Sequence, residues 1–185
     1  MHIDVLELAS SSSETRMLRR VEAISEIGYS AYLCGESLQR KIALNGFPEA
    51  VLKLLRTMCT QPVATTLRTN TLHSVTLMCR DCLEFQERAC DAGILTVASQ
   101  YLTDKTPSVR KCSASLLFVL FVGNARILRE ACSMSELTTG LQAVANEDWR
   151  SCGSWSCNEA DQALMLLALG ERSAGTSKRR IAKDL

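Results

Sequence analysis

The sequence is poor in the residues that turn a chain and in those that perform acid–base chemistry. Its 185 residues include three prolines and nine glycines, too few for a β-rich fold with frequent tight turns. The two histidines, His2 and His73, lie far apart, and neither belongs to a recognisable catalytic pair. A glycine-rich phosphate loop, a His-Glu-x-x-His motif and a Gly-x-Ser-x-Gly motif are all missing. The sequence therefore predicts a protein that is not an enzyme, with no cofactor and no small-molecule substrate.

An excess of charge of either sign is also missing. The chain has 21 lysines and arginines against 20 acidic residues, a net charge of +1 that gives no general attraction to nucleic acid. The run of seven apolar residues Leu116–Val122 is far shorter than the roughly 20 residues of a membrane-spanning helix. Arg110, Lys111 and Arg126 flank this run. We therefore expect no membrane span and no nucleic-acid partner.

The residues around this apolar run favour a helix over a buried strand. Pro107 suits the first position of a helix, and Val109, Leu116 and Leu120 recur at helical spacing. The sequence predicts a helix over 107–122 that stops at Gly123 or Asn124. Because this helix is apolar on more than one face, other segments must cover it on more than one side.

Internal repeats indicate which segments do so. Residues 67–93 align without a gap with residues 109–135, at an offset of 42, and residues 38–55 align with 85–102 at an offset of 47. Each unit is predicted to contain a short helix, a tight turn at glycine, a second helix and a longer third helix. The predicted short helices are 37–45, 83–92 and 125–134; the second helices are 47–60, 94–103 and 136–146; the long helices are 13–28, 62–80 and 107–122, with a last helix at 158–169.

The period of about 42 residues, with the segments NGFPEAVLKLLR and DAGILTVASQYL, resembles the armadillo repeat over residues 14–169. A helical repeat of the HEAT type is the alternative. The resemblance implies an all-α fold, a right-handed α-solenoid of about three units whose neighbours share one core. We expect an N-terminal lead-in at 1–12, with a serine cap at its end, a repeat domain at 13–169 and a basic flexible tail at 170–185.

Armadillo proteins hold extended peptides in a groove lined by their third helices, and the importin-type groove uses a Trp with an Asn four residues later. The matching pairs in this sequence are His73 with Leu77, and Ser115 with Val119. That peptide ladder is therefore not expected, and the groove should be more apolar than usual. An alternative is that its apolar residues pack inside the chain. The groove residues expected to contact a protein partner are His73, Leu77, Arg80, Val119 and Val122.

The segment 146–160 is long for the turn between a second and a third helix, and it contains both tryptophans, Trp149 and Trp155. Two interpretations stay open: the rings anchor a partner protein, or they fold back as an internal cap on the stack. The helix that follows has apolar residues on many sides, Met165 among them. We expect a partner to dock at this C-terminal end.

Nine cysteines are spread along the chain. An odd number suits a reducing compartment such as the cytoplasm, with a nuclear or cytoskeletal location also open. Cys79 with Cys82 and Cys152 with Cys157 provide the ligand set of a four-cysteine zinc site, but the pairs lie far apart and no metal is expected. The N-terminal segment lacks a basic head and makes a poor signal peptide.

These patterns together predict a protein–protein interaction module. We expect a scaffold or accessory subunit held in a stable complex with one or more proteins, since an apolar groove suits permanent partners. The alternative is an adaptor that binds peptides or cargo reversibly in the groove lined by the third helices.

Overall fold

The computed structural model describes residues 3–60, 63–147, 149 and 157–181. These residues form α-helices joined by short turns, and none of them lies in a β-strand. The predicted all-α class is therefore confirmed. Across the described residues, no helix combines the length and the apolar character that a membrane crossing requires.

The helices follow the order expected from the repeats. They are α1 (Ile3–Cys34), α2 (Glu36–Leu44), α3 (Phe47–Thr60), α4 (Thr65–Cys79), α5 (Leu83–Asp91), α6 (Ile94–Tyr101), α7 (Pro107–Phe121), α8 (Ala125–Cys132), α9 (Ser135–Ala145) and α10 (Glu159–Ile181). From α2 to α9 the bounds agree with the predicted ones to within about three residues.

The first and last helices are longer than predicted. Helix α1 begins at Ile3 and runs through the serine-rich segment, so the predicted start at residue 13 and its serine cap are wrong. Serine is tolerated inside helices at moderate cost, and here it does not end one. Helix α10 continues to Ile181 instead of stopping at residue 169. At Gly170 it still packs on α8, where an added Cβ would lie 3.1 Å from Leu128 Cγ.

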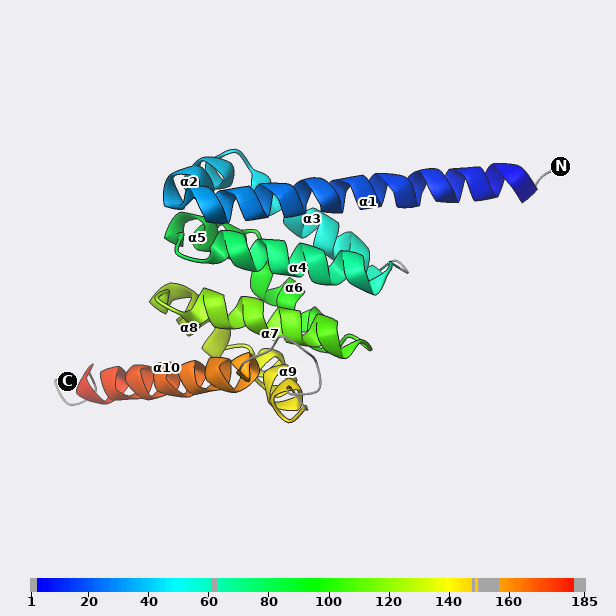
Figure 1. Cartoon of the computed structure of the whole chain (residues 1–185). Helices are drawn as coiled ribbons and strands as arrows, with labels where there is room; N and C mark the ends of the chain where they lie inside the picture. The colour runs from blue at the N-terminus through cyan, green and yellow to red at the C-terminus, as the bar shows by residue number, and fades with distance from the viewer. Residues whose placement is uncertain (1–2, 61–62, 148, 150–156, 182–185) are drawn as a thin grey trace.

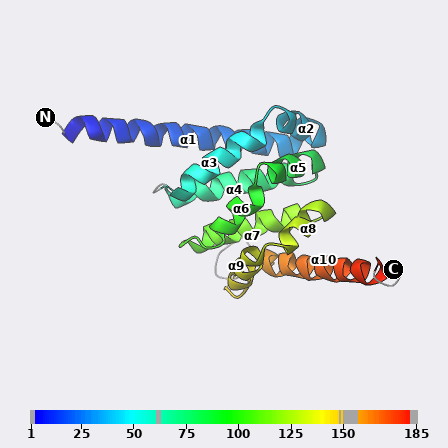
Figure 2. The same ribbon diagram turned by 180° about the vertical axis from the view of Figure 1, so that it is seen from behind.

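The long helices form a parallel stack. Helices α1, α4, α7 and α10 lie side by side in this order, each in contact with the next (Figure 1). The view from behind shows α3, α6 and α9 covering the other side of the stack (Figure 2). Helix α3 contacts α4, α6 contacts α7, and α9 contacts α10. Helices α4, α7 and α10 therefore each rest on the helix that comes immediately before them in the chain.

Helix α7 is the centre of the core, as the apolar run predicts. Leu116, Leu117 and Leu120 have no exposed surface, and Phe121 is 2% exposed. Helices α4, α6 and α10 surround α7 and explain why it is apolar nearly all round. The helix ends at Phe121, and Asn124 caps the next helix by accepting a hydrogen bond from the backbone N–H of Ile127.

An ion pair recurs between successive long helices. Arg68, in the first turn of α4, pairs with Asp104 at 3.1 Å, and both side chains are about nine-tenths buried. Arg110, the aligned residue in α7, pairs with Glu147 at 2.5 Å and also donates to the Asp104 carbonyl. Each arginine thus holds the loop that leads into the following long helix. Because the two ion pairs recur at aligned arginines, they support the sequence alignment independently of the apolar pattern.

The long helices also end in a common way. Gly35 follows α1, Asp81 lies two residues after α4, and Gly123 lies two residues after α7; all three have positive φ, between 61° and 78°. A residue of positive φ at this place ends the helix and turns the chain toward the next short helix. Asp81 adopts this conformation without being glycine, in keeping with the tolerance of Asp for it.

Replacing Gly123 by alanine should therefore destabilise the fold. No atom lies within 4 Å of the position of an added Cβ, so the cost comes from the backbone conformation alone. We expect Gly123→Ala to lower the free energy of unfolding by about 1 kcal/mol. Urea denaturation followed by circular dichroism measures this change. Gly123→Asn is the control and should cost less; equal stability of Gly123→Ala and the wild type would contradict a left-handed helix end.

Candidate protein-binding surfaces

A groove runs along the exposed face of α4 and α7. It consists of two hollows, of about 380 and 460 Å³, that share Arg80. We call the two together the α4–α7 groove. The first hollow is lined by residues that include Asn70, His73, Leu77, Arg80, Ser115 and Glu159. The second is lined by residues that include Arg80, Leu83, Gln86, Val119 and Val122.

The sequence-predicted groove residues therefore line adjoining hollows. His73 and Arg80 are exposed, Leu77 is half-buried, and Val122 is 49% exposed. Val119 is only 8% exposed, so it belongs mainly to the core, as the alternative interpretation expected of it. Most of the residues that line the first hollow have polar side chains, whereas the second hollow includes Leu83, Phe118, Val119 and Val122.

The polar groups of the first hollow come from α4, α7 and the start of α10. The Ser115 hydroxyl donates a hydrogen bond to the Glu159 carboxylate, which joins α7 to the start of α10. Among the described residues, none forms a hydrogen bond with the His73 imidazole. Burial, with a smaller contribution from the charge of Glu159, raises the pKa of the Cys112 thiol to about 11. Cys112 is thus protonated at neutral pH and is a poor nucleophile.

Alkylation should distinguish the exposed cysteine thiols from the buried ones. Cys34 and Cys157 are exposed, whereas Cys79 and Cys90 are buried, and burial raises the pKa of both buried thiols. At pH 8 a pKa near 11 lowers the thiolate fraction of Cys112 by roughly two orders of magnitude relative to an ordinary thiol. We expect iodoacetamide to label Cys34 and Cys157 in the native chain, and Cys79, Cys90 and Cys112 only after unfolding. Peptide mass spectrometry reads each site, and rapid native labelling of Cys112 would contradict its placement.

The proposed zinc ligands are not brought together among the described residues. Cys79 and Cys82 are buried, Cys157 is exposed, and Cys152 lies outside the described residues. In the described part of the chain, no group of three or more His, Cys, Asp or Glu side chains is placed to hold a metal ion.

Trp149 lies inside the molecule. Its ring is 6% exposed, its indole N–H donates to the Val144 carbonyl at 3.0 Å, and the Lys111 ammonium lies 5.5 Å from the ring centre. The ring therefore lies where the internal-cap interpretation places it. Because it is buried, its surface is not available to a partner protein. Trp155 lies outside the described residues.

The C-terminal helix presents apolar side chains to solvent, as the sequence predicts. Met165 is 58% exposed and Leu169, one turn later, is 57% exposed, while Leu167 is buried. Together, Met165 and Leu169 form a small apolar strip on α10. The strip lies at the last layer of the stack (Figure 1).

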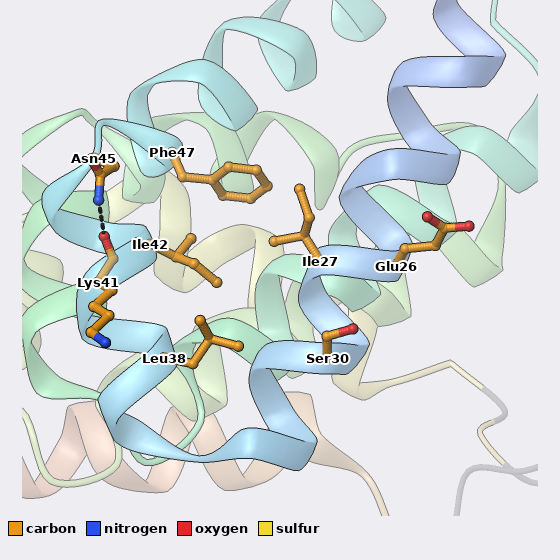
Figure 3. A pocket seen from close by; sticks show the side chains of 8 residues that line it. All are labelled: Glu26, Ile27, Ser30, Leu38, Lys41, Ile42, Asn45 and Phe47. Carbon is orange, nitrogen blue, oxygen red and sulfur yellow. Dashed lines mark hydrogen bonds between the residues drawn. The ribbon is translucent and has the colours of Figure 1, made fainter.

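A larger hollow at the opposite end was not predicted. Figure 3 shows Ile27 of α1, Leu38 and Ile42 of α2 and Phe47 of α3 around one space, with Lys41 beside it. We call this space of about 580 Å³ the N-terminal hollow. A second hollow of about 420 Å³ continues it between α1 and α3, and the two share Ile27 and Phe47.

The sequence contained a signal for this hollow. The alignment of 38–55 with 85–102 places Leu38, Ile42 and Phe47 at positions that are buried in the next unit.

No family model, curated protein or solved structure matches this chain. What its surfaces bind must follow from their own side chains.

Proposed function

We propose that this chain is a non-enzymatic protein–protein interaction module, a scaffold or accessory subunit of a larger assembly. In this proposal it is a short right-handed α-solenoid of armadillo type. The stacked long helices, the recurring arginine–carboxylate pair and the recurring left-handed helix ends support this architecture. The raised pKa of Cys112 and the position of His73 support a role without catalysis.

The exposed apolar side chains carry this proposal. Of the nine large apolar residues exposed in the described part of the chain, Leu83 and Val122 line the α4–α7 groove and the other seven lie on the two end layers of the stack. These seven are Leu18, Tyr29, Tyr32, Leu33 and Leu44 on α1 and α2, and Met165 and Leu169 on α10. Exposed apolar surface gathered in this way marks an interaction site, and permanent partners bury the more apolar surfaces. The end layers are therefore the surfaces that a stable partner covers.

Affinity purification of the tagged chain from cells tests this function. We expect a partner that stays bound at near-equal stoichiometry through size-exclusion chromatography in high salt, because apolar contacts resist salt. Leu33→Glu with Leu44→Glu, or Met165→Glu with Leu169→Glu, should reduce its recovery at least tenfold. The matched control, Val122→Glu, adds a charge in the α4–α7 groove and should retain it. Recovery of the chain alone would contradict the proposal.

The α4–α7 groove favours a second candidate, an adaptor that binds an extended peptide reversibly. Its first hollow offers the donors of Arg80 and Asn70 and the acceptor of Glu159 beside the apolar Leu77. Such mixed surfaces suit transient partners. An adaptor would lose its partner with Arg80→Glu and keep it with the end-layer variants, the opposite pattern to that of the stable subunit.

A further inference from the structure

The N-terminal hollow occupies the place of a helix in the repeated architecture. Helices α4, α7 and α10 each pack against a preceding second helix, namely α3, α6 and α9. Helix α1 stacks on α4 as α4 stacks on α7, so it has the position of a long third helix. Within the described residues no second helix packs on α1 in the corresponding way. The hollow lies between α1 and α3, where that helix would stand.

The burial of aligned residues shows how much surface is left uncovered. Leu38 and Ile42 align with Phe85 and Ala89, each 1% exposed beneath α2 and α3. Phe47 aligns with Ile94, which has no exposed surface. Leu38, Ile42 and Phe47 are themselves only half-buried. The same three positions are thus covered in the second unit and uncovered in the first.

The charges around the hollow indicate what should cover it. Lys41 aligns with Arg88, whose guanidinium lies 3.9 Å from the carboxylate of Glu49 in the first turn of α3. Among the described residues, no helix lies over the first unit as α3 lies over the second. Lys41 therefore has no counterpart of Glu49 beside it. Glu26 lines the N-terminal hollow together with Lys41, and Arg20 and Lys53 line the adjoining hollow, so the two hollows together have three cations and one acidic residue. Acidic groups are also favoured at the N-terminus of a helix by its dipole.

We propose that the N-terminal hollow binds an amphipathic α-helix of a partner protein, with an acidic residue in its first turn paired to Lys41. The apolar face of this helix covers Ile27, Ile42 and Phe47. Helix α3 is the internal example of such a ligand, because it joins Glu49 in its first turn to a buried apolar face. This inference rests on the proposed function and names the chemistry of its partner.

A labelled peptide provides the probe. It has the sequence of α3, residues 47–60, with Cys59→Ser and a fluorescein at its C-terminus, and its anisotropy is measured against the full chain. We expect saturable binding that Ile42→Glu weakens at least tenfold. Lys41→Glu should weaken it at least threefold, and a peptide carrying Glu49→Lys should recover binding to that variant. Gln142→Glu, at an exposed position of α9, is the control and should bind like the wild type.

Several results would overturn the inference. They are the absence of saturable binding to the wild type, equal binding to Ile42→Glu, or failure of the reversed charge pair. Light scattering adds another: a wild-type dimer that Ile42→Glu dissociates would assign the hollow to a second copy of the chain. Lys41 is exposed, so Lys41→Glu remains informative if Ile42→Glu fails to fold. A stable cellular complex without peptide binding would reject this inference alone, whereas peptide binding without any complex would reject the proposed function.

Discussion

Trp149→Ala should lower the free energy of unfolding by about 3–5 kcal/mol, the usual cost of removing a buried tryptophan side chain. The substitution leaves a cavity, leaves the Val144 carbonyl without the indole donor, and removes the ring beside the buried Lys111 ammonium. Chemical denaturation monitored by circular dichroism measures the loss.

Trp149→Phe separates packing from hydrogen bonding in this experiment. It keeps much of the apolar volume and loses the indole N–H, so its cost should fall between those of the wild type and Trp149→Ala. If Trp149→Ala melts like the wild type while a partner is lost, the ring is an interface anchor and its placement in the core is wrong.

Leu117→Asp should leave the chain largely unfolded. Leu117 has no exposed surface and lies on α7, between the helices that form the centre of the core. A Leu→Ala change at such a site costs roughly 2–5 kcal/mol, and an unpaired carboxyl group adds its desolvation to that cost. Together, these two costs are about as large as the whole free energy of unfolding of an ordinary domain.

Far-ultraviolet circular dichroism and a thermal melt measure this effect. Val122→Asp is the matched control, because Val122 follows α7 directly and is about half exposed. It should keep a cooperative transition close to that of the wild type. A cooperative, wild-type-like melt of Leu117→Asp would show that the register of α7 is wrong.

The helices between Glu36 and Ala145 were predictable because several local signals coincide there. Pro107 marks the start of α7, Gly46 and Gly93 mark tight turns, and the aligned copies reinforce each other. The third unit lacks a glycine at this turn, yet its helices follow the same pattern. Agreement among repeated units made the prediction strong where any single segment was weak.

The outer ends of the first and last helices could not be predicted from apolar periodicity. Residues 3–12 and 170–181 lose that pattern but remain helical. Apolar spacing reports which helix faces are buried, whereas the helix itself requires only tolerant residues and the absence of a break. The serine run before residue 14 therefore lies inside α1 and is not a cap.

The candidate surfaces were predictable only in part. The alignment placed Arg80 and Val122 at equivalent positions just after neighbouring long helices, and His73 and Ser115 at equivalent positions within them, which puts these residues on one face. The N-terminal hollow escaped prediction because it depends on which helix is missing beside α1, a relation between layers that no single motif records. The position of Trp149 depended equally on tertiary packing, since its sequence context fits both an anchor and a cap.

Hydrogen–deuterium exchange on the chain alone and in its purified cellular complex tests the central claim most directly. If the chain is a stable subunit bound through its end layers, exchange in the complex should slow at least tenfold in residues 20–57, around the N-terminal hollow, or in residues 159–170 of α10, around Met165 and Leu169. Residues 65–80 and 107–121, along the α4–α7 groove, should keep their rates. Slower exchange confined to the groove, or unchanged exchange at both end layers, would contradict the account.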